Sequence, residues 1–387
     1  MRKWTLIAGT LITAGILITF PLLFNSNGIE QVQSKLVEPA AAADLSGFTR
    51  ADKPRQFKFP ADFGAHPDYQ TEWWYYTGNL DTADGHHFGY QLTFFRRALL
   101  PPDNAAPRAS NWATQQVYMA HFALTDVSAG RFVAFERLSR AAGGLAGAQA
   151  SPYQVWLDDW SVKETGANTT QLHAAKGDLV IDLTLTDTTG PVLQGDHGYS
   201  QKGPGTGEAS YYYSLPHLES HGDIMVGAVS YQVSGLSWMD HEFSTSALAN
   251  DQVGWDWFAL QLSNGSELMI YQIRKADGSI DPFSSGTLIA PDGSSKHLKR
   301  DDVQINVEAT WKSPHTQALY PSRWQLNVPS INLSLEIEPY LQDQELNVSY
   351  SYWEGAVHFS GTTAGQAVNG AGYIEMTGYA KSMSGQF

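Results

Sequence analysis

The chain has 387 residues, 42% of them apolar and 12% aromatic, which is enough for two domains with packed cores. Its formal net charge is −15, from 39 acidic and 24 basic residues, and the basic residues form no long run. A polyphosphate backbone would be repelled, so we expect no nucleic-acid partner. Cysteine is absent, which excludes disulfides and thiolate metal sites.

Residues 1–24 have the pattern of an export signal or a membrane anchor. Met1-Arg2-Lys3 provides a positive flank, and the apolar stretch from Trp4 to Phe24, about 21 residues, is long enough to span a bilayer. The nearest small-residue cleavage pattern, Ala41-Ala42-Ala43, lies far beyond the end of this stretch. The sequence therefore favours an uncleaved anchor at residues 4–24 and predicts an exported, periplasmic or extracytoplasmic protein. A cleaved signal and a buried core helix are the alternatives.

Residues 25–54 are small, polar and rich in alanine, which is typical of a flexible tether. From Arg55 onward, short alternating segments rich in aromatic and β-branched residues recur, with almost no helical periodicity, so the predicted fold class is all-β. Two domains are expected, at residues 55–245 and 246–387. The segments with the clearest strand pattern are Gly89–Phe95, Val117–Leu124, Tyr153–Val162, Leu179–Leu185, Met225–Val233, Trp257–Leu262, Glu267–Ile273 and Leu333–Pro339.

Turn residues separate these segments. Hairpin turns are predicted at Asp84-Gly85, Asn264-Gly265, Asp277-Gly278 and Asp292-Gly293, because such pairs tolerate positive φ. Two longer segments rich in Gly and Pro, Leu100–Asn111 and Gly195–Ser210, are expected at a barrel mouth or an interdomain cleft. Antiparallel strands that close on themselves leave no exposed edge, and two tandem β-barrels after the membrane segment fit the chain length.

The most unusual stretch is the aromatic run from Trp73 through Trp74 and Tyr75 to Tyr76. Successive side chains of a strand point to opposite faces, so both faces of this strand must be covered by core or by a ligand. A similar hairpin recurs from Trp255 to Arg274. The sequence therefore predicts one aromatic hairpin used twice.

The densest group of ionisable residues is in the stretch Ser237–Phe243. Strand alternation places Trp238, Asp240 and Glu242 on one face and His241 on the other, so the three ionisable groups converge only if the strand bends or ends here. Aspartate can orient an imidazole, and an aromatic pocket can raise a carboxyl pKa into the range of a general acid. A satisfied polar cluster at a domain junction is the structural alternative.

Other polar residues lie within apolar strands. His121 is surrounded by apolar neighbours, and such a histidine is more often a hydrogen-bonded core residue than a ligand. Gln91, Glu72 and Arg96 lie in or beside aromatic strands, where burial without a partner is costly. An ion pair between Glu72 and Arg96 is the simplest explanation for that pair.

The signals for a metal site are weak. His217 and His221 have i, i+4 spacing, which brings two side chains together only in a helix, and no helix is expected there. His86-His87 lies at a hairpin tip. We therefore predict no metal site. The serine-nucleophile pattern G-x-S-x-G is absent from the sequence, so covalent hydrolysis has little support.

Together these motifs resemble a known family, the lipocalin-like proteins grouped with carotenoid 1,2-hydratase (hydroxyneurosporene synthase) and with the secreted AttH-like proteins that are predicted hydrolases. The resemblance spans most of the chain after the anchor. The motifs that carry it are Glu72–Leu80, Phe88–Arg96, Met119–Leu124, Ser237–Phe243 and Gly254–Phe258.

The resemblance implies two lipocalin-like barrels with an apolar site near their junction, and addition of water to an isoprenoid double bond without any cofactor. It implies His241 as acid or base, Asp240 as its orienting partner and Tyr271 as a hydrogen-bonding group. The hydratase branch has Asn-Trp after Asp-His and a carboxylate two residues after the tyrosine, where this chain has Glu242-Phe243 and Ile273. Glu242 is a candidate to supply the absent carboxylate. The residues expected to bind substrate are Trp73, Trp74, Tyr75, Gln91, His121, Trp238, Trp255 and Trp257.

Two classes of function follow. An enzyme would hydrate or hydrolyse a small apolar ligand, isoprenoid or lipid-like, by acid–base chemistry at the junction of the barrels. A binding protein would carry the same ligand without turning it over. An accessory factor of an export system and an enzyme acting on soluble sugars are further alternatives, and the sequence identifies no protein partner.

Overall fold

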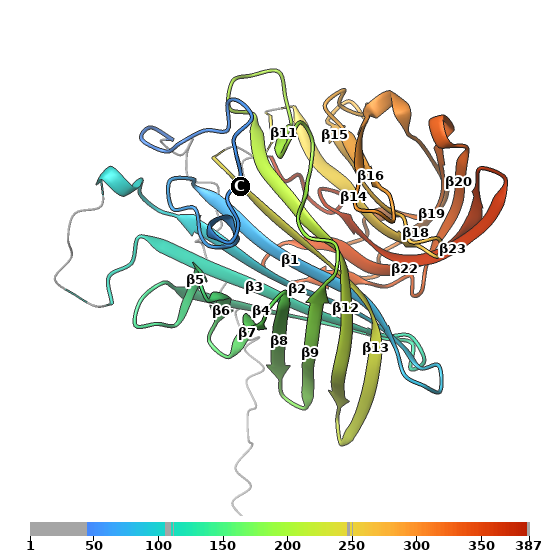
Figure 1. Cartoon of the computed structure of the whole chain (residues 1–387), viewed down its shortest axis with the longest axis horizontal. Helices are drawn as coiled ribbons and strands as arrows, with labels where there is room; N and C mark the ends of the chain where they lie inside the picture. Colours follow the sequence, from blue (N-terminus) through green and yellow to red (C-terminus); the bar gives the residue numbers. More distant parts are fainter. Residues whose placement is uncertain (1–44, 105–109, 111, 246–247, 250, 385–387) are drawn as a thin grey trace, which may run out of the picture. The chain divides into compact units, whose positions relative to one another are not determined.

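The computed structural model describes residues 45–104, 110, 112–245, 248–249 and 251–384. Its regular structure is almost entirely β, in two curled antiparallel sheets, one of them nearly closed into a barrel (Figure 1). The predicted all-β fold is confirmed. The predicted anchor at residues 4–24 lies outside the described residues. Within the described part of the chain, no helix is both long and apolar enough to cross a bilayer.

The first sheet contains 13 strands in the order β4-β3-β2-β1-β13-β12-β9-β8-β7-β6-β5, with β10 and β11 also paired to β12. The strands are β1 (Thr71–Asp81), β2 (His87–Ala98), β3 (Gln116–Asp126), β4 (Arg131–Arg140), β5 (Ala146–Ala150), β6 (Tyr153–Leu157), β7 (Trp160–Gly166), β8 (Thr169–Lys176), β9 (Leu179–Asp187), β10 (Val192–Leu193), β11 (Tyr199–Gln201), β12 (Ala209–Val226) and β13 (Val229–Ser244). Two short 3₁₀ helices accompany them, η2 (Ala61–Phe63) and η3 (Pro102–Asn104).

The second sheet contains 10 strands in the order β17-β16-β15-β14-β23-β22-β20-β19-β18, with β21 paired to β22. The strands are β14 (Gln252–Leu262), β15 (Glu267–Lys275), β16 (Ser285–Ile289), β17 (Ser295–Lys299), β18 (Gln304–Lys312), β19 (Leu319–Val328), β20 (Leu333–Pro339), β21 (Glu345–Asn347), β22 (Ser351–Thr363) and β23 (Gln366–Met376). The 3₁₀ helices η4 (Arg300–Asp302) and η5 (Pro329–Ile331) lie between strands.

Most of the predicted strands and turns are found. The glycines at all four predicted turns, Gly85, Gly265, Gly278 and Gly293, have positive φ. Two strand predictions were wrong, because each segment contains a turn. The segment Met225–Val233 turns between β12 and β13, and Tyr153–Val162 turns between β6 and β7. Neither turn contains an Asn-Gly or Asp-Gly pair, so neither carries the strongest sequence signal for a hairpin turn.

Each sheet encloses its own apolar core, and a third apolar cluster joins the two sheets. The junction is tight. A Cβ added to Gly89 of β2 would come within 2.4 Å of the Cβ of Ala356 on β22, so only glycine allows this approach. The Asn79 side chain also donates a hydrogen bond of 3.0 Å to the Gly372 carbonyl across the junction. The two sheets therefore meet as parts of one packed body.

The chain before β1 lies against the first sheet. Phe48 and Ala51 are buried, so the folded part begins before residue 55, and the end of the predicted tether at residue 54 is corrected. Tyr211 of β12 donates a hydrogen bond of 2.8 Å to the Lys53 carbonyl, and Trp74 of β1 donates one of 3.0 Å to the Phe63 carbonyl. These contacts hold the segment along β1 and β12.

Candidate active site

The geometry of the site follows from strand alternation in β1 and β13. The two strands are antiparallel neighbours, with Tyr75 opposite Asp240 and Trp73 opposite Glu242. Their side chains share one face, and this face meets the second sheet. His241, between the two acids, points to the opposite face, as the alternation predicted. The strand does not bend to bring the three ionisable groups together.

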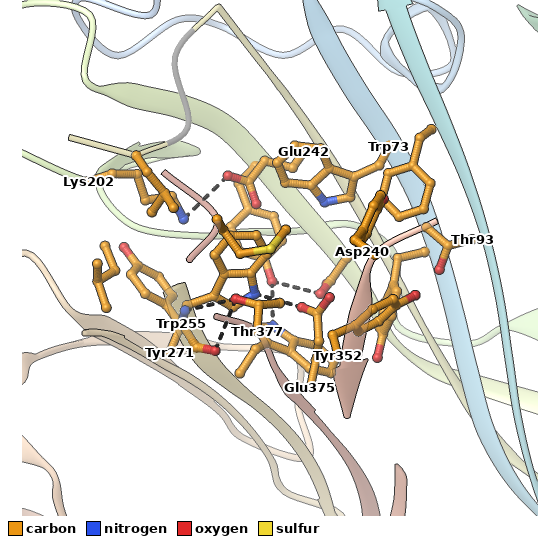
Figure 2. Close-up of a pocket in the computed structure, with 18 residues that line it drawn as sticks. Trp73, Thr93, Lys202, Asp240, Glu242, Trp255, Tyr271, Tyr352, Glu375 and Thr377 are labelled. Carbon is orange, nitrogen blue, oxygen red and sulfur yellow. Dashed lines mark hydrogen bonds and ion pairs between the residues drawn. The ribbon is translucent and has the colours of Figure 1, made fainter. Parts of the chain in front are cut away.

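The face that carries Asp240 and Glu242 forms one wall of a cavity at the meeting of the two sheets, which we call the junction pocket (Figure 2). Its volume is about 90 Å³. The lining residues are Trp73, Tyr75, Thr93, Phe95, Lys202, Tyr212, Asp240, Glu242, Leu248, Trp255, Trp257, Tyr271, Ile273, Tyr350, Tyr352, Glu375, Thr377 and Met383. Aromatic rings dominate this lining, and apart from the tyrosines its ionisable groups are three carboxyls and one lysine.

Asp240 is almost fully buried, with 4% of its surface exposed, and is held by three hydrogen-bond donors. Tyr212 donates to one carboxylate oxygen at 2.7 Å, while Trp238 Nε1, at 2.7 Å, and the Ser214 hydroxyl donate to the other. Burial raises the pKa of Asp240 to about 7, although these donors oppose the shift. The carboxyl group can therefore change protonation state near neutral pH.

Glu375 of β23 is the second acid of this kind. Burial raises its pKa to about 7, against the effect of a hydrogen bond of 2.7 Å from Trp255 Nε1, and the charges of Glu242 and Asp240 add to the rise. Asp240 accepts three hydrogen bonds whereas Glu375 accepts one. The anion is therefore better stabilised on Asp240, and the proton is better retained on Glu375.

Glu242 is paired with a cation. Lys202 Nζ lies 3.3 Å from a Glu242 carboxylate oxygen and 3.9 Å from the centre of the Tyr271 ring. Burial acts to lower the pKa of Lys202, but Glu242 and Tyr271 outweigh it and raise this pKa. The lysine therefore stays positively charged, and Glu242 serves as its counter-ion. The Tyr271 hydroxyl is anchored at 3.0 Å to both Ser200 and Ser285.

The structure brings seven of the predicted site residues together in the junction pocket: Trp73, Tyr75, Asp240, Glu242, Trp255, Trp257 and Tyr271. The two predicted aromatic hairpins meet there, with the Tyr75 and Trp257 rings edge to face at 5.0 Å. Five others do not line the pocket: Trp74, Gln91, His121, Trp238 and His241. Trp238 reaches it indirectly through its bond to Asp240. His121 lies behind the wall, 2.6 Å from the Tyr352 hydroxyl, and Gln91 donates to Thr93.

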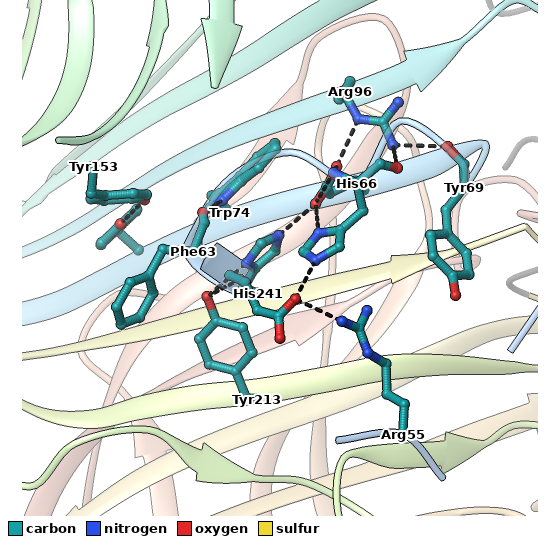
Figure 3. A network of polar contacts seen from close by, with 12 residues as sticks. Arg55, Phe63, His66, Tyr69, Trp74, Arg96, Tyr153, Tyr213 and His241 are labelled. Carbon is teal, nitrogen blue, oxygen red and sulfur yellow. Dashed lines mark hydrogen bonds and ion pairs between the residues drawn. The ribbon is translucent and has the colours of Figure 1, made fainter. Parts of the chain in front are cut away.

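His241 belongs instead to a buried ion network in the first sheet, formed by Arg55, Asp62, His66, Glu72, Arg96, Tyr213 and His241 (Figure 3). Glu72 is its centre. The Glu72 carboxylate lies 2.7 Å from Arg96 Nε, 2.7 Å from His66 Nδ1 and 2.8 Å from His241 Nε2. The predicted ion pair between Glu72 and Arg96 is confirmed. Trp74 stacks on the His241 ring at 4.7 Å, which places Trp74 in this network as well.

Protonation in the network is set by these contacts. Burial would raise the pKa of Glu72, but Arg96 and the two histidines hold it well below its usual range. Burial acts to lower the pKa of His66, yet its bonds to Asp62 and Glu72 raise it. His241 has no second carboxylate, and burial lowers its pKa. His66 is therefore the imidazolium of the network and His241 the neutral imidazole.

The network also contains the one group of three potential metal ligands among the described residues. The ligand atoms of His66, Glu72 and His241 lie within 4.8 Å of one another. However, both histidines are hydrogen-bonded to one Glu72 oxygen, and the Arg96 guanidinium donates to the other Glu72 oxygen. A divalent cation would lie next to that guanidinium. The arrangement fits an ion network better than a metal site.

The sequence reasoning missed Lys202, Tyr212 and Glu375. Glu375 interrupts an apolar strand in the same way as Glu72 does, so the criterion applied to Glu72 would have selected it. The same is true of Glu354, a buried acid whose pKa burial holds well above its usual range and to which the Tyr75 hydroxyl donates. Lys202 lies on the segment Gly195–Ser210, which was expected at a mouth or cleft, but nothing singled out that residue.

The fold and the pocket define a class of protein: two curled antiparallel sheets packed around an aromatic cavity that holds titratable acids. The AttH family model, described as AttH-like, matches residues 50–379, and the chain belongs to this family. The solved structure of an AttH protein from Nitrosomonas europaea has 36% sequence identity and a TM-score of 0.77, covering 86% of this chain and 100% of the other. The expected family and its lipocalin-like fold are thus confirmed.

Two named enzymes are more distant relatives. Kievitone hydratase from Fusarium solani subsp. phaseoli is 24% identical over 221 residues, which is 55% of this chain and 61% of the relative. Dehydratase asqC from Emericella nidulans is 23% identical over 223 residues, 54% of this chain and 61% of the relative. The match thus spans less than two thirds of each. A solved kievitone hydratase from Nectria haematococca shares the fold, with 15% identity, a TM-score of 0.65, and 87% and 98% of the two chains covered.

Proposed function

We propose that this chain is a hydratase or dehydratase that works by general acid–base catalysis in the junction pocket. The observation that carries the proposal is the pair Asp240 and Glu375, two carboxyls that face one aromatic cavity and have pKa values raised to about 7. Such a pair holds one proton near neutral pH, so it offers an acid and a base at once. The relationship to a named hydratase and a named dehydratase supports the same reaction class.

The proposed roles follow from the hydrogen bonds. In the hydration direction, the Glu375 carboxyl gives its proton to one alkene carbon, and the two π electrons form the new C–H bond. The positive charge on the other carbon is stabilised by the faces of Trp73, Trp255 and Trp257. Water attacks this carbon and loses a proton to the Asp240 carboxylate. A proton then returns from Asp240 to Glu375, and the reverse sequence removes water.

The proposed substrate is apolar, an isoprenoid or a lipid-like molecule. Support comes from the pocket walls, which are mainly aromatic and aliphatic. The predicted anchor at residues 4–24 is consistent with this choice, because an exported site near a membrane could take such a molecule from the bilayer. The proposed reaction uses the residues of the chain as its acid, base and cation-stabilising groups.

The experiment that tests the function is an isotope assay. The purified chain is incubated in H₂¹⁸O with a panel of isoprenoids that carry a trisubstituted double bond, and with the matching tertiary alcohols. We expect mass spectrometry to show one ¹⁸O atom incorporated as a hydroxyl group in at least one alkene, and loss of water from the matching alcohol. Tight binding of panel members without any ¹⁸O incorporation would instead identify a carrier.

The pH dependence of turnover is a second expectation. Catalysis needs Glu375 protonated and Asp240 ionised. As pH falls below about 7, Asp240 takes up a proton and can no longer accept one; as pH rises above it, Glu375 loses the proton it must give. The rate should therefore have a narrow maximum near pH 7 and fall about tenfold per pH unit well outside it. A rate independent of pH between 5 and 9 would contradict the assignment of both roles.

A further inference from the structure

A second cavity opens into the curl of the first sheet and plays no part in the proposed reaction. Its mouth includes the exposed residues 166–168 at the turn between β7 and β8. Its volume is about 250 Å³, far more than the roughly 10–15 Å³ that one water needs, and we call it the barrel cavity. Its apolar walls include Phe63, Leu185, Leu218 and Met239. Behind the mouth these buried and half-buried side chains form a concave, mainly apolar surface, which is the usual form of a small-molecule site. A cavity of this size and lining is suited to a bound molecule.

The barrel cavity and the junction pocket are back to back. Tyr75 and Asp240 are opposite each other across β1 and β13 and line the junction pocket, while the next pair, Tyr76 and Met239, lines the barrel cavity. The two strands are thus a shared wall with one cavity on each face. Phe63, which also lines the barrel cavity, lies on the side of the buried ion network away from Arg96 (Figure 3).

The polar groups of the barrel cavity define the ligand. Tyr76 and Tyr153 line it, and their hydroxyls are hydrogen-bonded to each other at 2.6 Å. Only one proton lies between them, so the pair keeps one hydroxyl proton and free lone pairs for a third group. At the rim, Glu164 and Asp187 bring negative charge, and each carboxylate accepts backbone N–H bonds through one oxygen. This rim disfavours an entering anion.

We propose that the barrel cavity is a second ligand site, for a neutral lipophilic alcohol or ketone whose oxygen binds the Tyr76 and Tyr153 hydroxyls. A fatty-acid anion with as many carbons as the alcohol should bind more weakly. Its charge would be buried among apolar side chains and repelled by the carboxylates of the rim. The site is independent of the proposed reaction, because its lining shares no residue with the junction pocket.

The test uses the full chain and two probes of equal length, 1-octanol and octanoate, titrated by calorimetry at neutral pH. We expect saturable binding of 1-octanol and at least tenfold weaker binding of octanoate. Tyr153→Phe should weaken octanol binding about 3- to 10-fold, the value of one neutral hydrogen bond, and leave turnover unchanged. Asp240→Asn, which alters only the junction pocket, should leave octanol binding in the barrel cavity intact.

A crystal structure of the chain with 8-bromo-1-octanol shows where the alcohol binds. The anomalous bromine signal should lie among Phe63, Leu218 and Met239. Bromine found only in the junction pocket, only on the surface, or nowhere would overturn the proposal, as would octanoate binding as tightly as octanol. Because the bromine position is read directly, this measurement remains decisive even where Tyr153→Phe fails to fold.

Discussion

Replacing Asp240 with asparagine is expected to reduce kcat/KM for water addition by roughly 10²–10⁴-fold, the usual contribution of a general base. The side chain keeps its size, but an amide cannot accept the proton that the attacking water must lose. Substrate affinity should change little, because asparagine has the size of aspartate and the apolar part of the pocket lining is formed by other residues. Glu375→Gln should have an effect of similar size, since an amide cannot give a proton to the alkene. Steady-state kinetics on the substrate found by ¹⁸O incorporation measures both.

The matched control for Asp240→Asn is Asp223→Asn, which makes the same change at an exposed position of β12. It should leave kcat and KM unchanged. Combining Asp240→Asn with Glu375→Gln separates the roles further: if the two acids act in one proton-transfer sequence, the double variant should lose much less than the product of the two single losses. A rate close to the parent in Asp240→Asn would sink the assignment of Asp240 as the base.

The aromatic hairpins are the part of the candidate site that the sequence predicted best. Alternation in the run from Trp73 to Tyr76 predicted two covered faces, and the structure has a cavity on each, with Tyr75 toward the junction pocket and Tyr76 toward the barrel cavity. Alternation also separated Asp240 from His241 correctly. Such predictions succeed because the period of a strand is local, so the face of a side chain does not depend on distant residues.

What the sequence could not give is which distant strands meet. Asp240 and Glu375 are far apart in the chain and face one pocket only because the two sheets pack together. In the same way, His66 reaches Glu72 and His241 because the segment before β1 lies along the first sheet. The resemblance implied His241 as acid or base with Asp240 as its orienting partner, but the backbone of β13 lies between the two side chains. The structure instead pairs His241 with Glu72 and Tyr213.

The buried ion network should dominate the stability of the first sheet. Arg96 is fully buried, and besides Glu72 it donates hydrogen bonds of 2.8 Å to the carbonyls of His66 and Tyr69. Arg96→Met would leave the Glu72 carboxylate without its guanidinium partner and both carbonyls without that donor. We expect the free energy of unfolding to fall by about 3–5 kcal/mol, measured by urea denaturation, because breaking one side of a buried pair leaves an uncompensated charge.

A double variant distinguishes the loss of the ion pair from the loss of side-chain packing. Adding Glu72→Gln to Arg96→Met removes the uncompensated charge, so the double variant should recover a large part of the stability that Arg96→Met loses.

The matched control is Arg323→Met on β19, which breaks only partly exposed ion pairs and should lower the free energy of unfolding by at most about 1 kcal/mol. In Arg96→Met, hydrogen exchange should also quicken between Arg55 and Tyr69, since Glu72 and Arg96 hold this segment through His66. Equal destabilisation in the single and double variants would show that the guanidinium contributes packing and carbonyl hydrogen bonds rather than charge compensation.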